Sequence, residues 1–150
     1  MHPSLEGGCS CGRVRYRLRE DPIAFYVCHC TDCQRESGSA FGLSMVVRTE
    51  ALERLTGEVR LVVVDKPGGR QSRTARCAEC FTRLWSEPAK FPQVRTLRPG
   101  TLDDTRAYEP FGNMWTRSAQ RWVAVAPGPR FEQQPEDPVE MVRVWQGRNR

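Results

Sequence analysis

The chain has 150 residues, a formal net charge of +5 and 39% hydrophobic residues. This length suits one domain, or one domain with a tail, and it excludes two large domains. The composition is not that of a disordered chain, and no apolar run approaches the roughly 18 residues of a membrane span. Residues 1–8 contain no apolar stretch typical of a secretory signal, so we expect a cytoplasmic protein that does not enter membranes.

The positive charge comes almost entirely from arginine, because the only lysines are Lys66 and Lys90. A positive domain suits an anionic partner, either nucleic acid or a small acid such as a carboxylate-bearing thiol. An excess of five charges is modest, however, and so strong a bias towards arginine is typical of a GC-rich genome. We therefore expect no nucleic-acid partner from the charge alone.

Strict alternation of polarity predicts the first strand at residues 13–19. Val14, Tyr16 and Leu18 form its dry face, and arginines form its wet face. This basic face could contact phosphates, but Tyr16 points the other way, so the aromatic residues needed for base stacking are absent from it. Further strands are predicted at 41–48 and 59–64, which are rich in β-branched residues, and at 23–27, 73–76, 83–86, 94–97 and 121–126.

The connections between these strands are short and contain little helix. One or two helical turns are predicted within 49–55, a hairpin turn at 66–69 and a second turn at 101–104. No long helical period occurs before residue 126, which predicts a mainly β domain over residues 1–126. Four prolines then mark residues 127–150 as a C-terminal tail that packs on the domain or trails from it. Within this tail, residues 139–145 form a short docking helix or fray.

Seven cysteines are the most informative feature of the composition. An odd number cannot be fully paired within one chain, and a chain without an export signal keeps its thiols reduced. Unbridged thiols at regular spacing are usually metal ligands or catalysts. They fall into three clusters: Cys9 with Cys11, then Cys28, Cys30 and Cys33, then Cys77 with Cys80.

The spacing divides the seven thiols into four and three. Cys9, Cys11, Cys77 and Cys80 supply the four ligands of a closed, structural zinc site. Cys28, Cys30 and Cys33 supply three ligands to a second zinc, which leaves a fourth position for water or substrate, as at a catalytic zinc. The alternative is that His29 completes a purely structural second site, although adjacent residues such as Cys28 and His29 rarely reach one ion. We expect His2 not to be a ligand.

The middle cluster contains a helix start. Thr31 and Gln34 fit a capping box, with Thr31 at the N-cap and Gln34 at N3. Cys33 then lies in the first turn, where free N–H groups and the helix dipole stabilise a thiolate.

The cysteine motifs and the residues that flank them resemble the glutathione-dependent formaldehyde-activating enzyme family, whose eukaryotic relatives include centromere protein V. The resemblance spans about residues 5–135 and depends on the order and spacing of all seven cysteines. It is carried by Gly7–Tyr16, Cys28–Gln34, Ser37–Phe41, Arg76–Cys80 and the Leu-Asp-Asp turn at 101–104.

The resemblance implies an Mss4-like fold of several coiled antiparallel β-sheets with two zinc sites. In the family the C-x-C and C-x-x-C pairs hold structural zinc, and the C-x-C-x-x-C cluster holds catalytic zinc. The implied activity is a carbon–sulfur lyase run in reverse, which joins formaldehyde to glutathione as S-(hydroxymethyl)glutathione.

The chain departs from the family pattern at three positions. Phe81 stands where glycine usually follows the C-x-x-C, so a positive φ there would be strained. Arg83 replaces a frequent proline. Asn113 stands where many members carry histidine, which places the substrate in doubt.

Two functions are therefore expected from the sequence. The first is a zinc-dependent enzyme that joins a small thiol, such as glutathione, to a small aldehyde. The second is a zinc module that binds glutathione, nucleic acid or a protein without turnover. Homo-oligomerisation stays open. For the enzyme, an arginine would offset the negative charge of three thiolates and hold a substrate carboxylate. The candidate substrate-binding residues are Arg35, Ser37, Ser39 and Arg48.

Overall fold

A computed structural model describes residues 4–148 and is built mainly of β-strands, as predicted. The strands are β1 (Leu5–Gly8), β2 (Arg15–Leu18), β3 (Ala24–Cys28), β4 (Gly42–Arg48), β5 (Leu52–Thr56), β6 (Val59–Lys66), β7 (Arg70–Cys77), β8 (Arg83–Ser86), β9 (Val94–Leu97), β10 (Asn113–Met114) and β11 (Arg130–Phe131). The helices are α1 (Thr31–Ser37) and α2 (Pro138–Arg148), with 3-10 turns η1 (Thr49–Ala51), η2 (Pro99–Thr101) and η3 (Thr116–Ser118).

The chain divides into two compact units that interleave along the sequence. Unit 1 comprises the described residues up to 22 together with 46–107, and unit 2 comprises 23–45 together with the described residues from 108 onward. Each unit contains one complete group of cysteines: the four-cysteine group lies in unit 1 and the three-cysteine group in unit 2.

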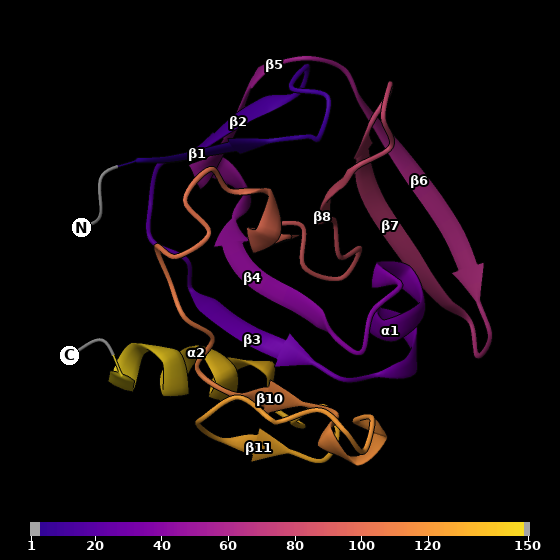
Figure 1. Cartoon of the computed structure of the whole chain (residues 1–150), viewed down its shortest axis with the longest axis vertical. Helices are drawn as coiled ribbons and strands as arrows, with labels where there is room; N and C mark the ends of the chain where they lie inside the picture. Colours follow the sequence, from indigo (N-terminus) through magenta and orange to yellow (C-terminus); the bar gives the residue numbers. More distant parts are fainter. Residues whose placement is uncertain (1–3, 149–150) are drawn as a thin grey trace. The chain divides into compact units, whose positions relative to one another are not determined.

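Unit 1 is formed by strands of two sheets (Figure 1). One sheet has the order β1-β2-β5, and β2 is antiparallel to both neighbours. The predicted alternation on β2 is confirmed, because Tyr16 and Leu18 are buried while Arg15 and Arg17 are half-exposed. The Tyr16 ring meets Trp85 of the second sheet edge-on, with 6.3 Å between centroids. In this unit the second sheet runs β9-β8-β7-β6.

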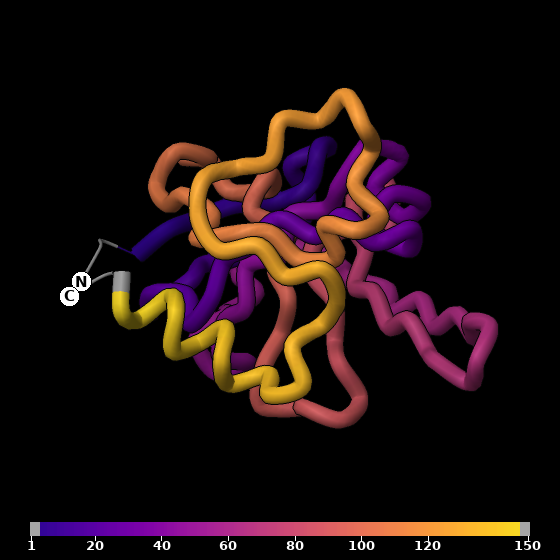
Figure 2. The backbone as a smooth tube through the Cα atoms, turned by 90° about the horizontal axis from the view of Figure 1, so that it is seen from below, coloured from indigo at the N-terminus to yellow at the C-terminus, as the bar shows by residue number. Residues whose placement is uncertain are grey.

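Unit 2 is built around β3, which lies between β10 and β4. β10 runs parallel to both β3 and β11, and its two residues stand opposite Val27 and Cys28. Helix α2 lies alongside β3 (Figures 1 and 2). Its side chains Met141 and Trp145 are buried, and Trp145 contacts the ring of Phe111 at 6.4 Å between centroids.

The structure corrects the sequence prediction at two segments. Residues 121–126, predicted as a strand, form a turn and irregular backbone, and Trp122 is 77% exposed. Only part of 49–55 is helical, because η1 ends at Ala51 and β5 follows. The short strands β1, β10 and β11 were not predicted, since two to four residues carry too little periodicity to be recognised without their partners. The hairpin turn at 66–69 is confirmed. No helix within residues 4–148 is long and apolar enough to cross a membrane.

Candidate metal centres

The Sγ atoms of the four-cysteine group, Cys9, Cys11, Cys77 and Cys80, all lie within 4.8 Å of one another. The sulfurs of Cys9 and Cys11 are 3.4 Å apart, and those of Cys11 and Cys77 are 3.8 Å apart. A tetrahedral zinc with bonds of about 2.3 Å separates its sulfurs by about 3.8 Å. All four thiols are free rather than bridged. The predicted grouping is therefore confirmed, and the geometry fits a four-coordinate metal.

The first half of this group is a tight turn after β1. The Gly12 N–H donates to the Cys9 carbonyl at 3.0 Å, and the Val14 N–H donates to the Cys9 sulfur at 3.3 Å. Gly12 has φ 77, in the left-handed region that glycine adopts without strain. The backbone thus orients both sulfurs and supplies a hydrogen bond that stabilises a thiolate.

The second half is a turn between β7 and β8 that is one residue longer and contains no glycine. The Phe81 N–H donates to the Cys77 carbonyl at 3.1 Å, in the place that Gly12 has in the first turn. Phe81 has φ 60, so the expectation of a strained positive φ at this position is confirmed. Its side chain is 55% exposed, so little packing offsets that strain.

Thr82 connects the two turns. Its hydroxyl lies 3.1 Å from the Cys80 sulfur and 3.1 Å from the Ser10 hydroxyl, and it accepts a hydrogen bond from the Ser10 N–H. The hydrogen bond with Thr82 lowers the pKa of Cys80 to about 5, so this ligand is a thiolate at neutral pH.

The three-cysteine group, Cys28, Cys30 and Cys33, lies where β3 ends and α1 begins. Its sulfurs also lie within 4.8 Å of one another, and no fourth His, Cys, Asp or Glu of the described residues joins them. Cys28 is buried, whereas Cys30 and Cys33 are partly exposed. The alternative in which His29 completes this group is not supported, because its ring nitrogens lie outside the cluster. The described residues therefore offer this group three donors, one fewer than a tetrahedral zinc binds.

The helix start differs from the predicted capping box. The N-cap is Cys30 rather than Thr31, and its sulfur accepts a hydrogen bond from the Cys33 N–H at 3.3 Å. Gln34 consequently lies one position beyond N3. Thiol contacts with Cys28 and Cys33, together with this N–H, hold the pKa of Cys30 far below its ordinary value. The same contact with Cys30 raises the pKa of Cys28.

Gln34 has a positioning role that the capping-box interpretation missed. Its Nε2 donates to the carbonyl of His29 at 2.9 Å and to the carbonyl of Ser118 at 3.0 Å. Its Oε1 accepts a hydrogen bond from Gln120 at 3.2 Å. One side chain of α1 thereby ties the cysteine loop to the segment that follows β10.

His29 and Asn113 form a buried polar pair beside the cluster, and the sequence did not predict their contact. His29 is 1% exposed, and its Nε2 lies 3.1 Å from the Asn113 Oδ1. The Asn113 Nδ2 donates to the Ala126 carbonyl at 2.8 Å, so Oδ1 accepts and Nε2 carries the hydrogen. The Nδ1 of His29 has no hydrogen-bond partner among the described residues. The departure from the family pattern at Asn113 is the signal that pointed here.

The predicted substrate-binding residues are divided between the two units of the chain. Arg35 is exposed on α1, next to the cysteine cluster in sequence. The Ser37 hydroxyl donates to the Cys33 carbonyl at 2.7 Å and accepts from the Ser39 N–H at 3.2 Å, which closes the helix end around Gly38. Arg48, in unit 1, forms an ion pair with Glu20.

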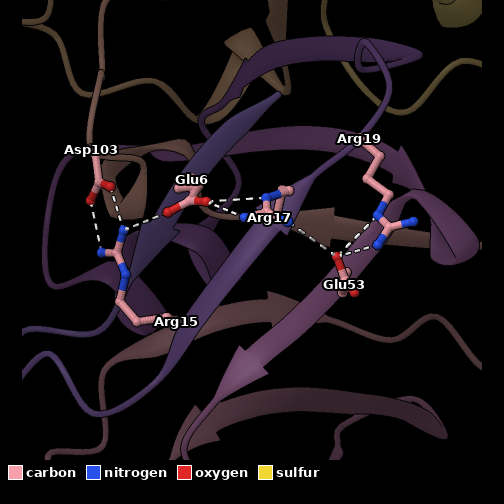
Figure 3. Close-up of polar contacts among 6 residues, drawn as sticks. All are labelled: Glu6, Arg15, Arg17, Arg19, Glu53 and Asp103. Carbon is pink, nitrogen blue, oxygen red and sulfur yellow. Dashed lines mark hydrogen bonds and ion pairs between the residues drawn. The ribbon is translucent and has the colours of Figure 1, made fainter. Parts of the chain in front are cut away.

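The basic face of β2 is neutralised within unit 1 (Figure 3). Arg15 pairs with Asp103 and lies 3.7 Å from Glu6, and Arg17 pairs with the same Glu6 at 2.7 Å. Arg19, just beyond the strand, pairs with Glu53 of β5 at 2.7 Å. These arginines bridge neighbouring segments of one unit, and none of the three presents an uncompensated charge to a phosphate backbone.

Comparison with known proteins agrees with the cysteine geometry. The family model described as glutathione-dependent formaldehyde-activating enzyme matches residues 4–118. This segment covers most of the chain and contains all seven cysteines. The chain therefore belongs to the glutathione-dependent formaldehyde-activating enzyme family.

Two relatives carry that family's name provisionally. One, from Emericella nidulans, is 30% identical over 88 residues, which cover 55% of this chain and 44% of the relative. The other, from Halomonas elongata, is 27% identical over 94 residues, which cover 60% of each chain. The chain thus spans less than two thirds of the length of either relative.

A solved structure supports the fold. A crystal structure of a Rhodobacter sphaeroides protein is similar with a TM-score of 0.50 at 16% identity, over 66% of this chain and 88% of that one. At this identity the similarity concerns the fold alone.

Proposed function

We propose that this chain joins a small thiol of the glutathione type to a small aldehyde such as formaldehyde, at the Cys28, Cys30 and Cys33 cluster. The observation that supports this proposal is that three thiols converge at the start of α1 with no fourth ligand among the described residues. The four-thiol group, by contrast, has a complete ligand set, as structural zinc sites do.

Zinc is the metal proposed for both groups, because clustered thiolates are its usual structural ligands and the sulfur separations suit tetrahedral bonds. Bound to the three thiols, it would supply a Lewis acid that lowers the pKa of a substrate thiol. The chain's own residues hold the cluster in place. Cys30 caps α1, and the side chain of Gln34 donates hydrogen bonds to the cysteine loop at His29 and to the segment after β10 at Ser118.

The proposed reaction forms one carbon–sulfur bond. The thiol sulfur attacks the carbonyl carbon, and the carbonyl oxygen receives the thiol proton, so the product is a hydroxymethyl thioether. Arg35 is proposed to pair with a carboxylate of the thiol, because it is exposed on the helix that carries Cys33. Ser39, and Ser37 after loss of its helix-end contact, are proposed as further hydrogen-bond donors.

The decisive experiment compares one ligand from each group. Cys30→Ser is expected to lower the zinc content from two per chain to one, to keep the folded circular-dichroism spectrum, and to abolish adduct formation. Adduct formation is measured by NMR exchange between hydrated formaldehyde and its glutathione adduct, as the rate above the uncatalysed exchange. Cys80→Ala is the comparison from the four-thiol group. It is expected to give insoluble or unfolded protein, because structural zinc contributes on the order of 10 kcal/mol in small domains.

Three outcomes would count against the proposal. Wild-type exchange in Cys30→Ser would make the three-thiol cluster structural. Glutathione binding by the native protein without accelerated exchange would favour the alternative of a zinc module that only binds. Unfolding of Cys30→Ser would show that the seven thiols are divided differently.

A further inference from the structure

Strand β6 is an edge strand with an apolar middle. It pairs with β7 along its whole length and stands last in the strand order, so its other side has no partner strand among the described residues (Figure 1). Leu61, Val63 and Val64 are 39%, 46% and 49% exposed. In Figure 2 the backbone tube of the β6–β7 hairpin forms a long, narrow loop that ends in the turn at 67–69.

The features that usually protect an edge are missing from the middle of β6. Natural edge strands carry Lys, Pro, bulges or inward charges that prevent pairing with another chain. Residues 61–64 are all apolar, and the register of β6 against β7 is unbroken from Val59 to Lys66. The free side of β6 is therefore a template for one more strand.

The hydrogen bonds define which residues face this free side. The Ala78 N–H donates to the Glu58 carbonyl at 3.0 Å, so this pair is a hydrogen-bonded one. Because such pairs alternate along an antiparallel ladder, even-numbered residues of β6 bond to β7. The odd-numbered residues direct their N–H and C=O groups outward, and they are Val59, Leu61, Val63 and Asp65.

We propose that two copies of this chain associate through β6, antiparallel, across a two-fold axis at Val62. In an antiparallel pair of strands, side chains directly opposite each other point to the same face of the sheet. The two-fold axis of a symmetric pair can therefore pass through Val62 or through its neighbour Val63. With the axis at Val62, Leu61 lies opposite Val63 of the other copy. Glu58 lies opposite Lys66 of the other copy, and the two-fold symmetry repeats both pairs. Centred on Val63, Arg60 would face Lys66, and like charges opposite each other are destabilising. The sequence of β6 thus complements itself in one full-length register, which favours a second copy as the occupant.

The first test is the oligomeric state of the zinc-loaded chain. Sedimentation equilibrium is expected to give a dimer, and Val62→Lys, which places two lysines together at the axis, is expected to weaken it at least tenfold. Gln71→Lys adds the same charge on β7 and is the matched control, expected to leave the dimer unchanged. A monomer at tens of micromolar, a dimer that tolerates Val62→Lys, or an open series of larger oligomers would each overturn the proposal.

A charge exchange and a cross-link test the register itself. Glu58→Lys or Lys66→Glu alone is expected to weaken the dimer, and the double variant to restore it, because opposite charges then face each other again. Val62→Cys is expected to give a disulfide-linked dimer under oxidation, while Val64→Cys, which faces Arg60, is not. Failure of the double variant to restore association, or equal cross-linking at both positions, would contradict this register even if Val62→Lys failed to fold.

Discussion

Phe81 shows how one residue can depart from a local backbone requirement. It has φ 60 after Cys80, and the equivalent residue of the other turn is Gly12 with φ 77. A left-handed conformation costs a side chain with a Cβ about 1–2 kcal/mol, whereas glycine adopts it freely. The turn that ends at Phe81 brings the sulfurs of Cys77 and Cys80 into the four-thiol group.

Phe81→Gly is accordingly expected to stabilise the zinc-loaded protein by about 1 kcal/mol, after the greater unfolded-state entropy of glycine is allowed for. The midpoint of thermal unfolding should rise by about 2 °C. Gly12→Ala is the mirror-image control, and it should destabilise by about 1 kcal/mol, because no atom within 4 Å crowds the added Cβ and only φ matters. A fall in stability for Phe81→Gly would mean that the half-exposed ring contributes more than its strain.

Tyr16 predicts an alkaline limit to stability. Burial raises its pKa to about 12, from an ordinary value near 10. The unfolded chain therefore loses this proton at lower pH than the folded chain. Stability should be complete below pH 10 and should fall by up to about 2 kcal/mol between pH 10 and 12. Denaturant unfolding along this pH series measures the effect. Tyr16→Phe should flatten the alkaline slope, and an unchanged slope would refute the assignment to Tyr16.

Helix α1 begins on a metal-ligand candidate, so its stability and the cluster are linked. Because Cys30 is the N-cap, Thr31→Ala should change the free energy of unfolding by less than about 0.5 kcal/mol. A true N-cap threonine would lose about 1 kcal/mol. Urea titration of the zinc-loaded protein distinguishes the two values. A loss of 1 kcal/mol or more would restore the capping box that the sequence predicted.

Helix α2 is held to unit 2 by its apolar side chains rather than by its own helical propensity. Trp145 is 6% exposed and contacts the rings of Tyr108 and Phe111. Trp145→Ala is expected to destabilise the protein by about 3 kcal/mol or more. Val139, on the same helix but 50% exposed, supplies the control, and Val139→Ala should have an effect below about 1 kcal/mol. Equal effects of both variants, by denaturant unfolding, would mean that α2 does not dock through Trp145.

At the scale of the whole molecule, each unit contains one cysteine group, so metal removal should occur in two steps. A chelator is expected to strip the three-thiol group first, because it offers one thiol ligand fewer than the four-thiol group. The four-thiol group joins β1 to β7 and β8, so its loss should abolish the β-sheet spectrum. Released zinc and circular dichroism, followed together, measure both steps. Simultaneous release and unfolding would contradict the separation of a structural group from an open one.

Local features were predictable from the sequence because they depend on neighbours in the chain. Strict alternation predicted β2, β-branched residues predicted β4 and β6, and the spacing of the seven cysteines divided them into four and three. The prediction of 121–126 as a strand was wrong because a strand also depends on a partner that is distant in the sequence. Its residues have a strand-like composition, but no strand of the described chain pairs with them, and a strand exists only with a partner.

The sequence by itself therefore determined the mainly β class, the two thiol groups and the strained turn at Phe81, since ligand type, spacing and backbone sterics are local properties. Only the tertiary structure decided that Cys30 caps α1, that Arg15, Arg17 and Arg19 are neutralised within unit 1, and that Asn113 meets His29. The last contact joins residues 84 positions apart. Such pairs form when β10 docks beside β3, and a single sequence carries no local signal for a contact that folding alone creates.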